Sequence, residues 1–338
     1  MATTIRERAA AVATTFNSNV DTSRRIAFLT LVLANALWAG TYTAGKVALD
    51  RLSPVELNAL RFTLASLMLS PVLIRGWRQI PRDRRSLFLL ARLVLLGFVL
   101  NKIFEYIGLA LSTASDVALL IATESLFTAM LSWTLLRERV SRIGVAALLV
   151  GLAGAYLIVA RGLVPQFDPG HTDTRILGDV LVVLSLLIEA GYSVLGKSAV
   201  TTVPPLLFTS VSITGSLFVW IPAGLISVAH SGWPHMTPNT WLAVLYMAAI
   251  ATVTGYWLWF RGLRVLDGST AAPTLFIQPL LGAALAIWLL HDRVTWATLL
   301  GGVLIGVSLL LVMRGTRSAP SEPTQPAHPP IVVEEPTP

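Results

Sequence analysis

Long runs of apolar residues alternate with short polar segments along most of the chain. A helix needs about 20 residues to cross the roughly 30 Å of hydrocarbon in a bilayer. Ten runs reach this length and predict ten transmembrane helices. They cover residues 26–47, 54–74, 86–110, 113–136, 141–160, 177–198, 204–227, 239–261, 268–290 and 295–314. Several connections are very short, so we expect antiparallel neighbours in a compact all-α bundle.

The runs repeat a common pattern. With an offset of 154 residues, Glu138-Arg139-Val140 aligns with Asp292-Arg293-Val294 at the ends of the fourth and ninth runs. With an offset of 151, Lys46 aligns with Lys197 in the first and sixth runs. Each copy holds five runs, and this odd number makes the second copy cross the membrane in the opposite direction. Such inverted repeats are typical of secondary transporters, which hold substrate near the bilayer midplane.

The pattern also divides the chain into segments. Residues 26–160 form the first copy, residues 177–314 the second, and residues 161–176 a polar linker between them. Residues 1–25 lack the apolar core of a secretory signal, so we expect a disordered cytosolic arm. Residues 315–338 are Pro-rich and show no helical pattern, which predicts a disordered cytosolic tail.

Composition strengthens the membrane interpretation. The 338 residues are 54% hydrophobic and only 13% charged, with a mean hydropathy of +0.71, whereas a soluble domain carries about 25% charged residues. The chain has no cysteine, which excludes disulfides, thiolate metal sites and a cysteine nucleophile. The net charge of +7 comes from basic residues between apolar runs, so we expect lipid rather than nucleic acid as the partner.

The basic residues also predict the orientation. Lys and Arg concentrate in cytoplasmic loops. If the N-terminus is inside, the outside segments hold only four basic residues, Arg51, Arg161, Arg175 and Arg293. The sequence therefore predicts a multi-pass protein of the cell membrane with both termini in the cytoplasm.

The residues resemble the EamA type of the drug/metabolite transporter superfamily over about residues 26–314. The matching residues are Trp38-Ala39-Gly40, Lys46, Pro54, Arg61, Leu136-Arg137-Glu138-Arg139-Val140 and Leu290-His291-Asp292-Arg293-Val294. The resemblance implies ten helices in two inverted repeats, small-molecule transport that is mostly export, and no bound cofactor.

Two positions depart from the family pattern. The first copy has Glu124-Ser125 where the second has Gln278-Pro279, and the family usually has the proline. The second copy has His291-Asp292 where a Gly-Glu pair is common. The first departure places an ionisable group at bilayer depth and indicates a subgroup with its own substrate.

Ionisable residues inside the apolar runs are candidate functional residues, since a charge at the bilayer centre costs about 2.5–3.5 kcal/mol. Glu124 lies at the centre of the fourth run. It either binds a cationic substrate or a coupled proton in a cavity, or forms a structural ion pair with Arg61 or Lys102. Glu189 occupies the position that Trp38 holds in the first copy. It contributes either a substrate-binding carboxylate or a hydrogen bond to a neighbouring helix.

Other candidates complete the site. Lys102 and Glu105 are three residues apart on one helix face, which predicts a local salt bridge beside the path. Arg61 either binds a substrate carboxylate or partners Glu124 or backbone carbonyls. We expect the aromatic cavity wall to come from Trp38, Tyr42 and Tyr192, which suit a cationic group. Gln278 marks where the two copies differ.

The sequence lacks the motifs of several other functions. The sequence has no GxxxxGK[ST] motif for ATP hydrolysis and no HExxH zinc motif. The five histidines are scattered over loops, span ends and the tail, with no metal or catalytic cluster visible. We therefore expect no enzyme activity, metal or cofactor.

The sequence thus favours an alternating-access exporter of small metabolites, amino acids or cationic and amphipathic drugs, with proton coupling left open. Two alternatives stay open, a membrane enzyme acting on a lipid-linked substrate and a non-transporting membrane scaffold. The expected partners are a small-molecule substrate and the bilayer, not nucleic acid, and a homodimer is also left open.

Overall fold

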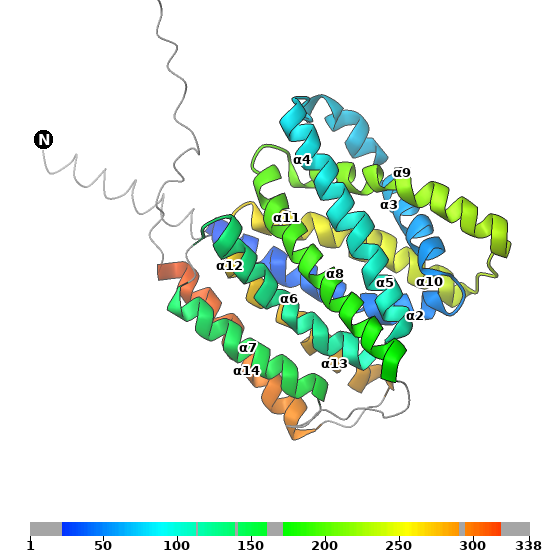
Figure 1. Ribbon diagram of the computed structural model, residues 1–338. Coiled ribbons are helices and arrows are strands. Elements are labelled where there is room, and N and C mark those ends of the chain that lie inside the picture. Colours follow the sequence, from blue (N-terminus) through cyan, green and yellow to red (C-terminus); the bar gives the residue numbers. More distant parts are fainter. Residues whose placement is uncertain (1–21, 113, 139–140, 161–171, 291–294, 319–338) are drawn as a thin grey trace, which may run out of the picture.

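The computed structural model describes residues 22–112, 114–138, 141–160, 172–290 and 295–318. Within these ranges the chain consists of helices joined by short loops, with no strand (Figure 1). The all-α class predicted from the apolar runs is therefore confirmed. Residues 1–21 of the predicted arm, 161–171 of the predicted linker and 319–338 of the predicted tail lie outside the described residues. The remaining residues of these segments, 22–25, 172–176 and 315–318, are helical, so the predicted boundaries were wrong by a few residues.

The first half of the chain begins with a helix over residues 22–38 and a turn at residues 39–40. The elements that follow are α2 (Thr41–Leu49), α3 (Pro54–Gly76), η1 (Trp77–Gln79), α4 (Arg84–Val94), η2 (Leu95–Leu100), α5 (Asn101–Leu111), α6 (Ala114–Leu135) and α7 (Arg142–Ala160). η2 is a π-helical stretch that joins α4 to α5 without a break in the helix.

The second half follows a similar plan. Its elements are α8 (Thr172–Ala199), α9 (Pro205–Ser231), α10 (Pro238–Leu245), η3 (Tyr246–Gly255), α11 (Tyr256–Leu263), α12 (Gly268–Ala271), η4 (Ala272–Phe276), α13 (Ile277–Leu290) and α14 (Trp296–Ser318). η3 is again π-helical and joins α10 to α11, whereas η4 is a 3₁₀ turn between α12 and α13.

Seven helical segments of the described chain are long and apolar enough to cross a membrane. Two further apolar helices, Leu120–Leu135 and Arg142–Ile158, are shorter by the same measure. The ninth predicted run, 268–290, is divided among α12, η4 and α13, and Pro273 lies at the start of η4. A proline cannot donate a helical hydrogen bond, which favours such a break. The count of ten spans stays a prediction.

Polar residues at the loops determine where several helices begin. Ser53 and Glu56 form a capping box at the start of α3, which has Pro54 in its first turn. Asp83 caps α4 by accepting a hydrogen bond from the Ser86 backbone N–H at 2.9 Å, and this bond lowers the pKa of Asp83. Thr237 caps α10 in the same way. The loop residues therefore satisfy backbone donors that a helix end leaves free.

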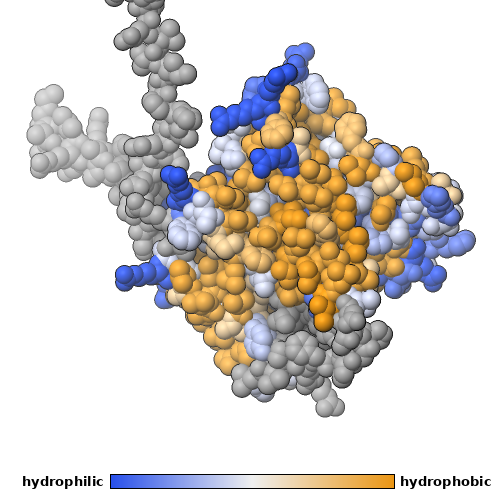
Figure 2. All heavy atoms as spheres, in the orientation of Figure 1, coloured by the Kyte–Doolittle hydropathy of each residue, from blue (hydrophilic) through white to orange (hydrophobic). Residues whose placement is uncertain are grey.

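The outer surface is broadly apolar. Figure 2 shows hydrophobic residues across the middle of one face and hydrophilic residues mainly towards its edges. Large apolar side chains on different helices are exposed, among them Phe218, Leu225 and Leu299. A soluble monomer rarely exposes apolar patches of more than a few hundred Å². The surface therefore suits contact with lipid.

Helices far apart in sequence pack closely, and glycines face each other at some of the crossings. α5 packs along α8, α3 along α9, and α7 along α14. At the α5–α8 crossing, a Cβ added to Gly108 would lie 2.8 Å from the backbone oxygen of Gly178. Backbone atoms cannot move aside as a flexible side chain can. Glycine at this crossing therefore sets the distance between α5 and α8, the two helices that carry Lys102, Glu105 and Glu189.

We expect Gly108→Ala to destabilise the protein, because its methyl group would force α5 and α8 apart. Overpacking of this kind costs about 1–3 kcal/mol. The apparent melting temperature in detergent, followed by tryptophan fluorescence, should fall by several degrees. Gly306→Ala is the matched control, since nothing lies within 4 Å of a Cβ at Gly306. Equal melting temperatures for the two variants would contradict this account of the crossing.

Candidate functional site

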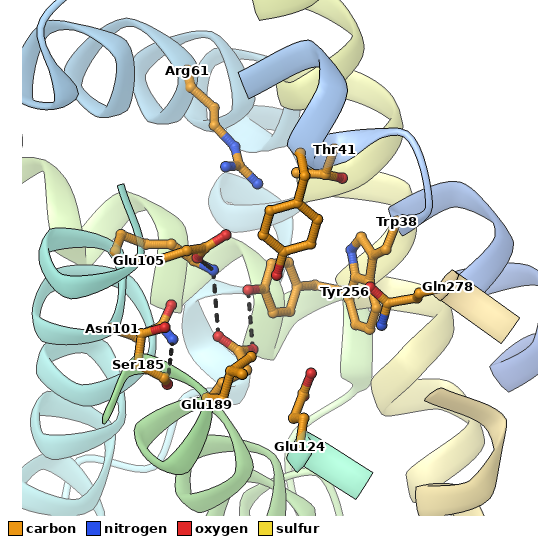
Figure 3. Close-up of a pocket in the computed structure, with 13 residues that line it drawn as sticks. Trp38, Thr41, Arg61, Asn101, Glu105, Glu124, Ser185, Glu189, Tyr256 and Gln278 are labelled. Atoms are coloured by element: carbon orange, nitrogen blue, oxygen red, sulfur yellow. Dashed lines mark hydrogen bonds and ion pairs between the residues drawn. The ribbon is translucent and has the colours of Figure 1, made fainter. Parts of the chain in front are cut away.

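A polar cavity lies in the middle of the bundle, enclosed by helices from both halves of the chain (Figure 3). The space open to the centre of a water molecule is about 40 Å³, enough for a few waters. The lining residues are Trp38, Thr41, Tyr42, Arg61, Asn101, Lys102, Glu105, Glu124, Ser185, Leu186, Glu189, Tyr256 and Gln278. Eight of the nine candidates from the sequence are in this set; Tyr192 is not.

Lys102 is shared between two carboxylates. Its Nζ lies 2.5 Å from Glu105 Oε2 and 3.4 Å from Glu189 Oε2. The salt bridge expected from the spacing of Lys102 and Glu105 is thus present, and it extends to α8. Tyr256 donates a hydrogen bond to the other oxygen of Glu189, Oε1, at 3.1 Å. Glu105 and Glu189 are therefore held by partners inside the protein.

Glu124 differs from these two carboxylates. It is 6% exposed, and its carboxylate points into the cavity in Figure 3. Within the described part of the chain, neither Arg61 nor Lys102 forms an ion pair with it, and no hydrogen bond to it occurs. The structural pair considered from the sequence is thus absent here. Glu124 is the cavity carboxylate that lacks a partner.

Arg61 is fixed by neutral side chains. Its Nε donates to Thr252 Oγ1 at 2.6 Å, and its Nη1 donates to the Tyr106 hydroxyl at 2.6 Å. Nη2 has no hydrogen bond to a described residue. Figure 3 shows the guanidinium directed into the cavity from α3, while Glu124 enters from α6. The cavity thus presents a cation and a carboxylate that do not pair with each other.

The aromatic wall comes from Trp38, Tyr42 and Tyr256. The Trp38 indole donates to the Ala251 carbonyl at 2.8 Å and lies edge-on to the Tyr256 ring, with centroids 5.2 Å apart. Gly255 makes room for the indole, because a Cβ there would lie 2.5 Å from Trp38 Nε1. The wall therefore joins Trp38 and Tyr42 from the first half of the chain to Tyr256 from the second, and the centre of the Tyr256 ring lies 5.9 Å from Lys102 Nζ.

Tyr192, the third expected wall residue, lies elsewhere. It is fully buried in an aromatic cluster, where its ring is perpendicular to Phe98 and stacked on Phe208. It supports the wall from behind, since its centroid is 6.1 Å from that of Tyr256. Tyr256 takes the place that we expected for Tyr192. The small residues beside Tyr192 indicated a close contact, but they could not show which side of the helix faces the cavity. The sequence alone therefore could not show which of the two tyrosines lines it.

Gln278 reaches the cavity from the second copy. Its Nε2 donates to Asn35 Oδ1 at 3.0 Å, and Asn35 Nδ2 donates to Thr274 Oγ1 at 3.1 Å. These bonds join α13 to the first helix. Gln278 thus lies in the cavity wall with its amide nitrogen already bonded. It faces the same space as Glu124, with which it aligns in the sequence repeat.

Irregular helical turns precede many lining residues. π-helical η2 directly precedes Asn101 and Lys102, and π-helical η3 directly precedes Tyr256. The turn at 39–40 precedes Thr41 and Tyr42. The 3₁₀ turn η4 leads into Gln278. Each irregularity rotates the following residues about the helix axis, and π-bulges occur frequently at functional sites. Regular 3.6-residue periodicity could not reveal these rotations.

Two polar clusters lie at opposite ends of the bundle. Lys197 binds Glu138 at 2.5 Å and Asp267 at 2.9 Å, joining the ends of α8 and α6 to the start of α12. Lys46 donates to the backbone carbonyls of Leu109 and Ser112. Both lysines therefore connect the end of one helix to a loop, as a structural role in each copy would require. No group of three metal-ligating side chains occurs in the described ranges.

Comparison with known proteins decides the family. Residues 25–160 and residues 176–314 each match the EamA-like transporter family, so the family's sequence pattern occurs twice along the chain. The chain belongs to the EamA-like transporter family. Membership agrees with the resemblance found in the sequence, and the apolar helices make this a multi-pass membrane protein.

Several relatives cover nearly the whole chain. An uncharacterized transporter of Archaeoglobus fulgidus is 29% identical, over 82% of this chain and 93% of its own length. A probable amino-acid metabolite efflux pump of Salmonella typhimurium is 24% identical, over 87% of this chain and 97% of its own length. A crystal structure of a protein 22% identical in sequence superposes with a TM-score of 0.68 and covers 86% of this chain and 97% of that one. This last likeness concerns the fold.

Measurements of stability should distinguish the two carboxylates that Lys102 holds from Glu124, which has no partner. We expect Lys102→Met to destabilise the protein by about 3–5 kcal/mol, because it leaves two buried carboxylates without their cation. Glu124→Gln should leave the melting temperature unchanged or raise it, because it removes a charge that has no partner. Thermal unfolding in detergent measures both.

The double variant Lys102→Met/Glu105→Gln is the control, since it removes a cation together with one of its carboxylates. It should recover part of the stability lost in Lys102→Met. A strong loss of stability in Glu124→Gln would contradict the geometry described for Glu124.

Proposed function

We propose that this protein exports small amine-bearing metabolites, of which amino acids are the first class to test. The observation that carries the proposal is the unpaired Glu124 carboxylate in a central cavity. A buried carboxylate without a cation attracts an ammonium group or a proton strongly, because the low dielectric of the site screens the charge weakly. The family supplies the transport activity.

Arg61, which enters the cavity from α3, is the reason to expect a substrate that also carries an anionic group. Arg61 keeps Nη2 free while Tyr106 and Thr252 hold the rest of the guanidinium. An α-amino acid has an ammonium group for Glu124 and a carboxylate for Arg61. The rings of Trp38 and Tyr256 line the same cavity and favour an ammonium group by cation–π attraction. The name of the Salmonella typhimurium relative supports the same class and the outward direction.

The small cavity supports alternating access. A space that holds a few waters is too small for most amino acids, so side chains must move apart when such a substrate enters. The proposed ten helices form two inverted repeats whose rocking opens the cavity to one side and then the other. The sequence repeat, with Lys46 aligned on Lys197, and the double family match support this arrangement. We place both termini in the cytoplasm, at the cell membrane.

Proton coupling follows from the charge balance of the cavity. The cavity has two cations, Lys102 and Arg61, and three carboxylates, Glu105, Glu124 and Glu189. One positive charge is missing when all three carboxylates are ionised. A proton at Glu124 supplies it. A substrate ammonium group pairs with Glu124 in place of the proton, while the substrate carboxylate pairs with Arg61, so that proton and substrate exclude each other. Such competition exchanges substrate for protons.

Transport in liposomes tests the proposal. With an acid lumen, the wild type should accumulate radiolabelled L-amino acids, tested as a mixture and then singly, as protons leave in exchange. Glu124→Gln should abolish accumulation at normal expression and melting temperature, because a neutral amide neither binds ammonium nor exchanges a proton. Amino-acid methyl esters should compete less well than the amino acids, since they lack the anion for Arg61.

Glu56→Gln is the matched control. Glu56 is 8% exposed but lies in the capping box of α3, away from the cavity, and glutamine also serves in a capping box. This variant should transport normally. Normal accumulation by Glu124→Gln would remove Glu124 from the mechanism, and no accumulation by the wild type for any amino acid would overturn the substrate class.

A further inference from the structure

One face of α6 carries three buried hydroxyl groups that have no hydrogen-bond partner among the described residues. They belong to Ser125, Thr128 and Ser132, which are each fully buried. Their spacing of three and four residues places them above one another on the same helix face. With a rise of about 1.5 Å per residue, they extend over about 10 Å of the helix.

Other hydroxyls on the same helix behave differently. Thr123 donates to the Leu120 carbonyl at 2.6 Å, and Thr134 donates to the Met130 carbonyl at 2.9 Å. Such bonds to a preceding carbonyl are the usual arrangement for a hydroxyl within a helix. Among the described residues of α6, the hydroxyls without a partner therefore lie on its buried face.

Three unbonded hydroxyls on one face would be costly. A buried polar group without a partner costs about 1–3 kcal/mol. Buried polar groups of this kind are usually satisfied by internal water molecules. Thr41 Oγ1 and Asn101 Oδ1, both of cavity residues, also lack protein partners. The cavity groups and the row of hydroxyls on α6 thus share the same need for a hydrogen-bond partner.

The row connects two charged sites. At one end, Ser125 directly follows Glu124, the unpaired cavity carboxylate. At the other end, Ser132 faces the start of α12, where a Cβ on Gly268 would lie 2.2 Å from Ser132 Oγ. Glu138, one helical turn or so further on, binds Lys197 and accepts from the Ser269 backbone N–H at 3.2 Å. Lys197 also binds Asp267, whose side chain is 60% exposed.

The second copy has no equivalent row. At the offset of 154, Ser125, Thr128 and Ser132 align with Pro279, Gly282 and Ala286, none of which has a hydroxyl. The polar row therefore leads from the cavity towards one side of the bundle only. In Figure 1 this is the side of α12, near which the blue start and the red end of the coloured ribbon also lie.

We propose that Ser125, Thr128 and Ser132 hold a chain of water molecules that conducts protons between Glu124 and the Glu138 end of α6. This inference rests on the proposed function, because it supplies a proton route for the exchange at Glu124. Each oxygen along the row accepts one proton and passes one on, so that the hydroxyls and waters are unchanged. The net result is a proton gained or lost at the Glu124 carboxylate.

Charged and titratable groups around the two ends set the conditions for this transfer. Those in the cavity with Glu124 are Tyr42, Arg61, Lys102, Glu105, Glu189 and Tyr256. Those at the other end are Lys197 and Asp267, which contact or share contacts with Glu138. The row between them consists of neutral hydroxyls, so a proton on it is stabilised by water and not by a fixed counter-charge.

The test uses the full chain in liposomes of phosphatidylethanolamine and phosphatidylglycerol. A trapped pH dye reports proton release from an acid lumen when L-amino acids are added. Counterflow of labelled against unlabelled amino acids at equal pH reports substrate exchange without net proton movement. In Ser125→Ala/Thr128→Val/Ser132→Ala, proton release should fall by about tenfold or more, a rise of about 1.4 kcal/mol or more in the barrier, because the waters lose their three hydroxyl partners. Counterflow should stay within about twofold of the wild type, a change of less than 0.5 kcal/mol.

Two variants control for folding and for the hydroxyl itself. Thr123→Val/Thr134→Val removes the hydroxyls that bond to carbonyls and should change neither readout. Thr128→Val alone should lower proton release, and Thr128→Ser should restore it because serine keeps the hydroxyl. Proton release at the wild-type rate in the triple variant would overturn the water chain alone. Parallel loss of both readouts in Thr128→Val would overturn it in favour of a packing role.

A wild type that shows neither counterflow nor proton release would overturn the proposed function, and the inference with it.

A second measurement detects water directly. Because the chain has no cysteine, single cysteines can be placed without background. Thr128→Cys should react with a small water-soluble thiosulfonate, whereas Ala129→Cys, which is slightly less buried but lies among apolar side chains, should not. Equal reactivity of the two would contradict a hydrated face.

Discussion

The central constraint of this structure is the division of charge in its buried cavity. Lys102 is shared between Glu105 and Glu189, and Arg61 is held by a tyrosine and a threonine. Glu124 is thereby left without a cation in a place where an isolated charge is costly. The bundle supports this arrangement through close helix crossings, such as that of Gly108 and Gly178. A site with one unmatched carboxylate requires a positive group beside it. In the proposed mechanism, a proton and the substrate ammonium group occupy this position in turn.

Part of this site could be predicted from the sequence, since charges inside apolar runs are costly enough to identify. The residues Lys102, Glu105, Glu124, Glu189 and Arg61 all line the cavity that the structure shows. The spacing of Lys102 and Glu105 predicted their ion pair. The choice between a paired and a free Glu124 could not be made in advance, because it depends on the rotation of α5 and α8 relative to α6.

The sequence was least informative where the helices depart from regular geometry. Tyr256 follows a π-helical stretch, which is why its ring faces the cavity while Tyr192 turns into the aromatic core. The family and the all-α class were predictable because they depend on long apolar runs and on two copies of a motif. The number of spans, the inversion of the copies and the position of the termini remain predictions. The unpartnered hydroxyls of α6 depend on side-chain directions that no sequence pattern specifies.

The most direct test of the central claim counts protons. In weakly buffered detergent solution, binding of an amino-acid substrate should release about one proton per chain near the pH at which Glu124 is protonated, because its ammonium group replaces the proton. Glu124→Gln should release none, while Glu56→Gln should release as many as the wild type. Proton release that persists in Glu124→Gln would contradict the account, since the exchanged charge would then lie on another group.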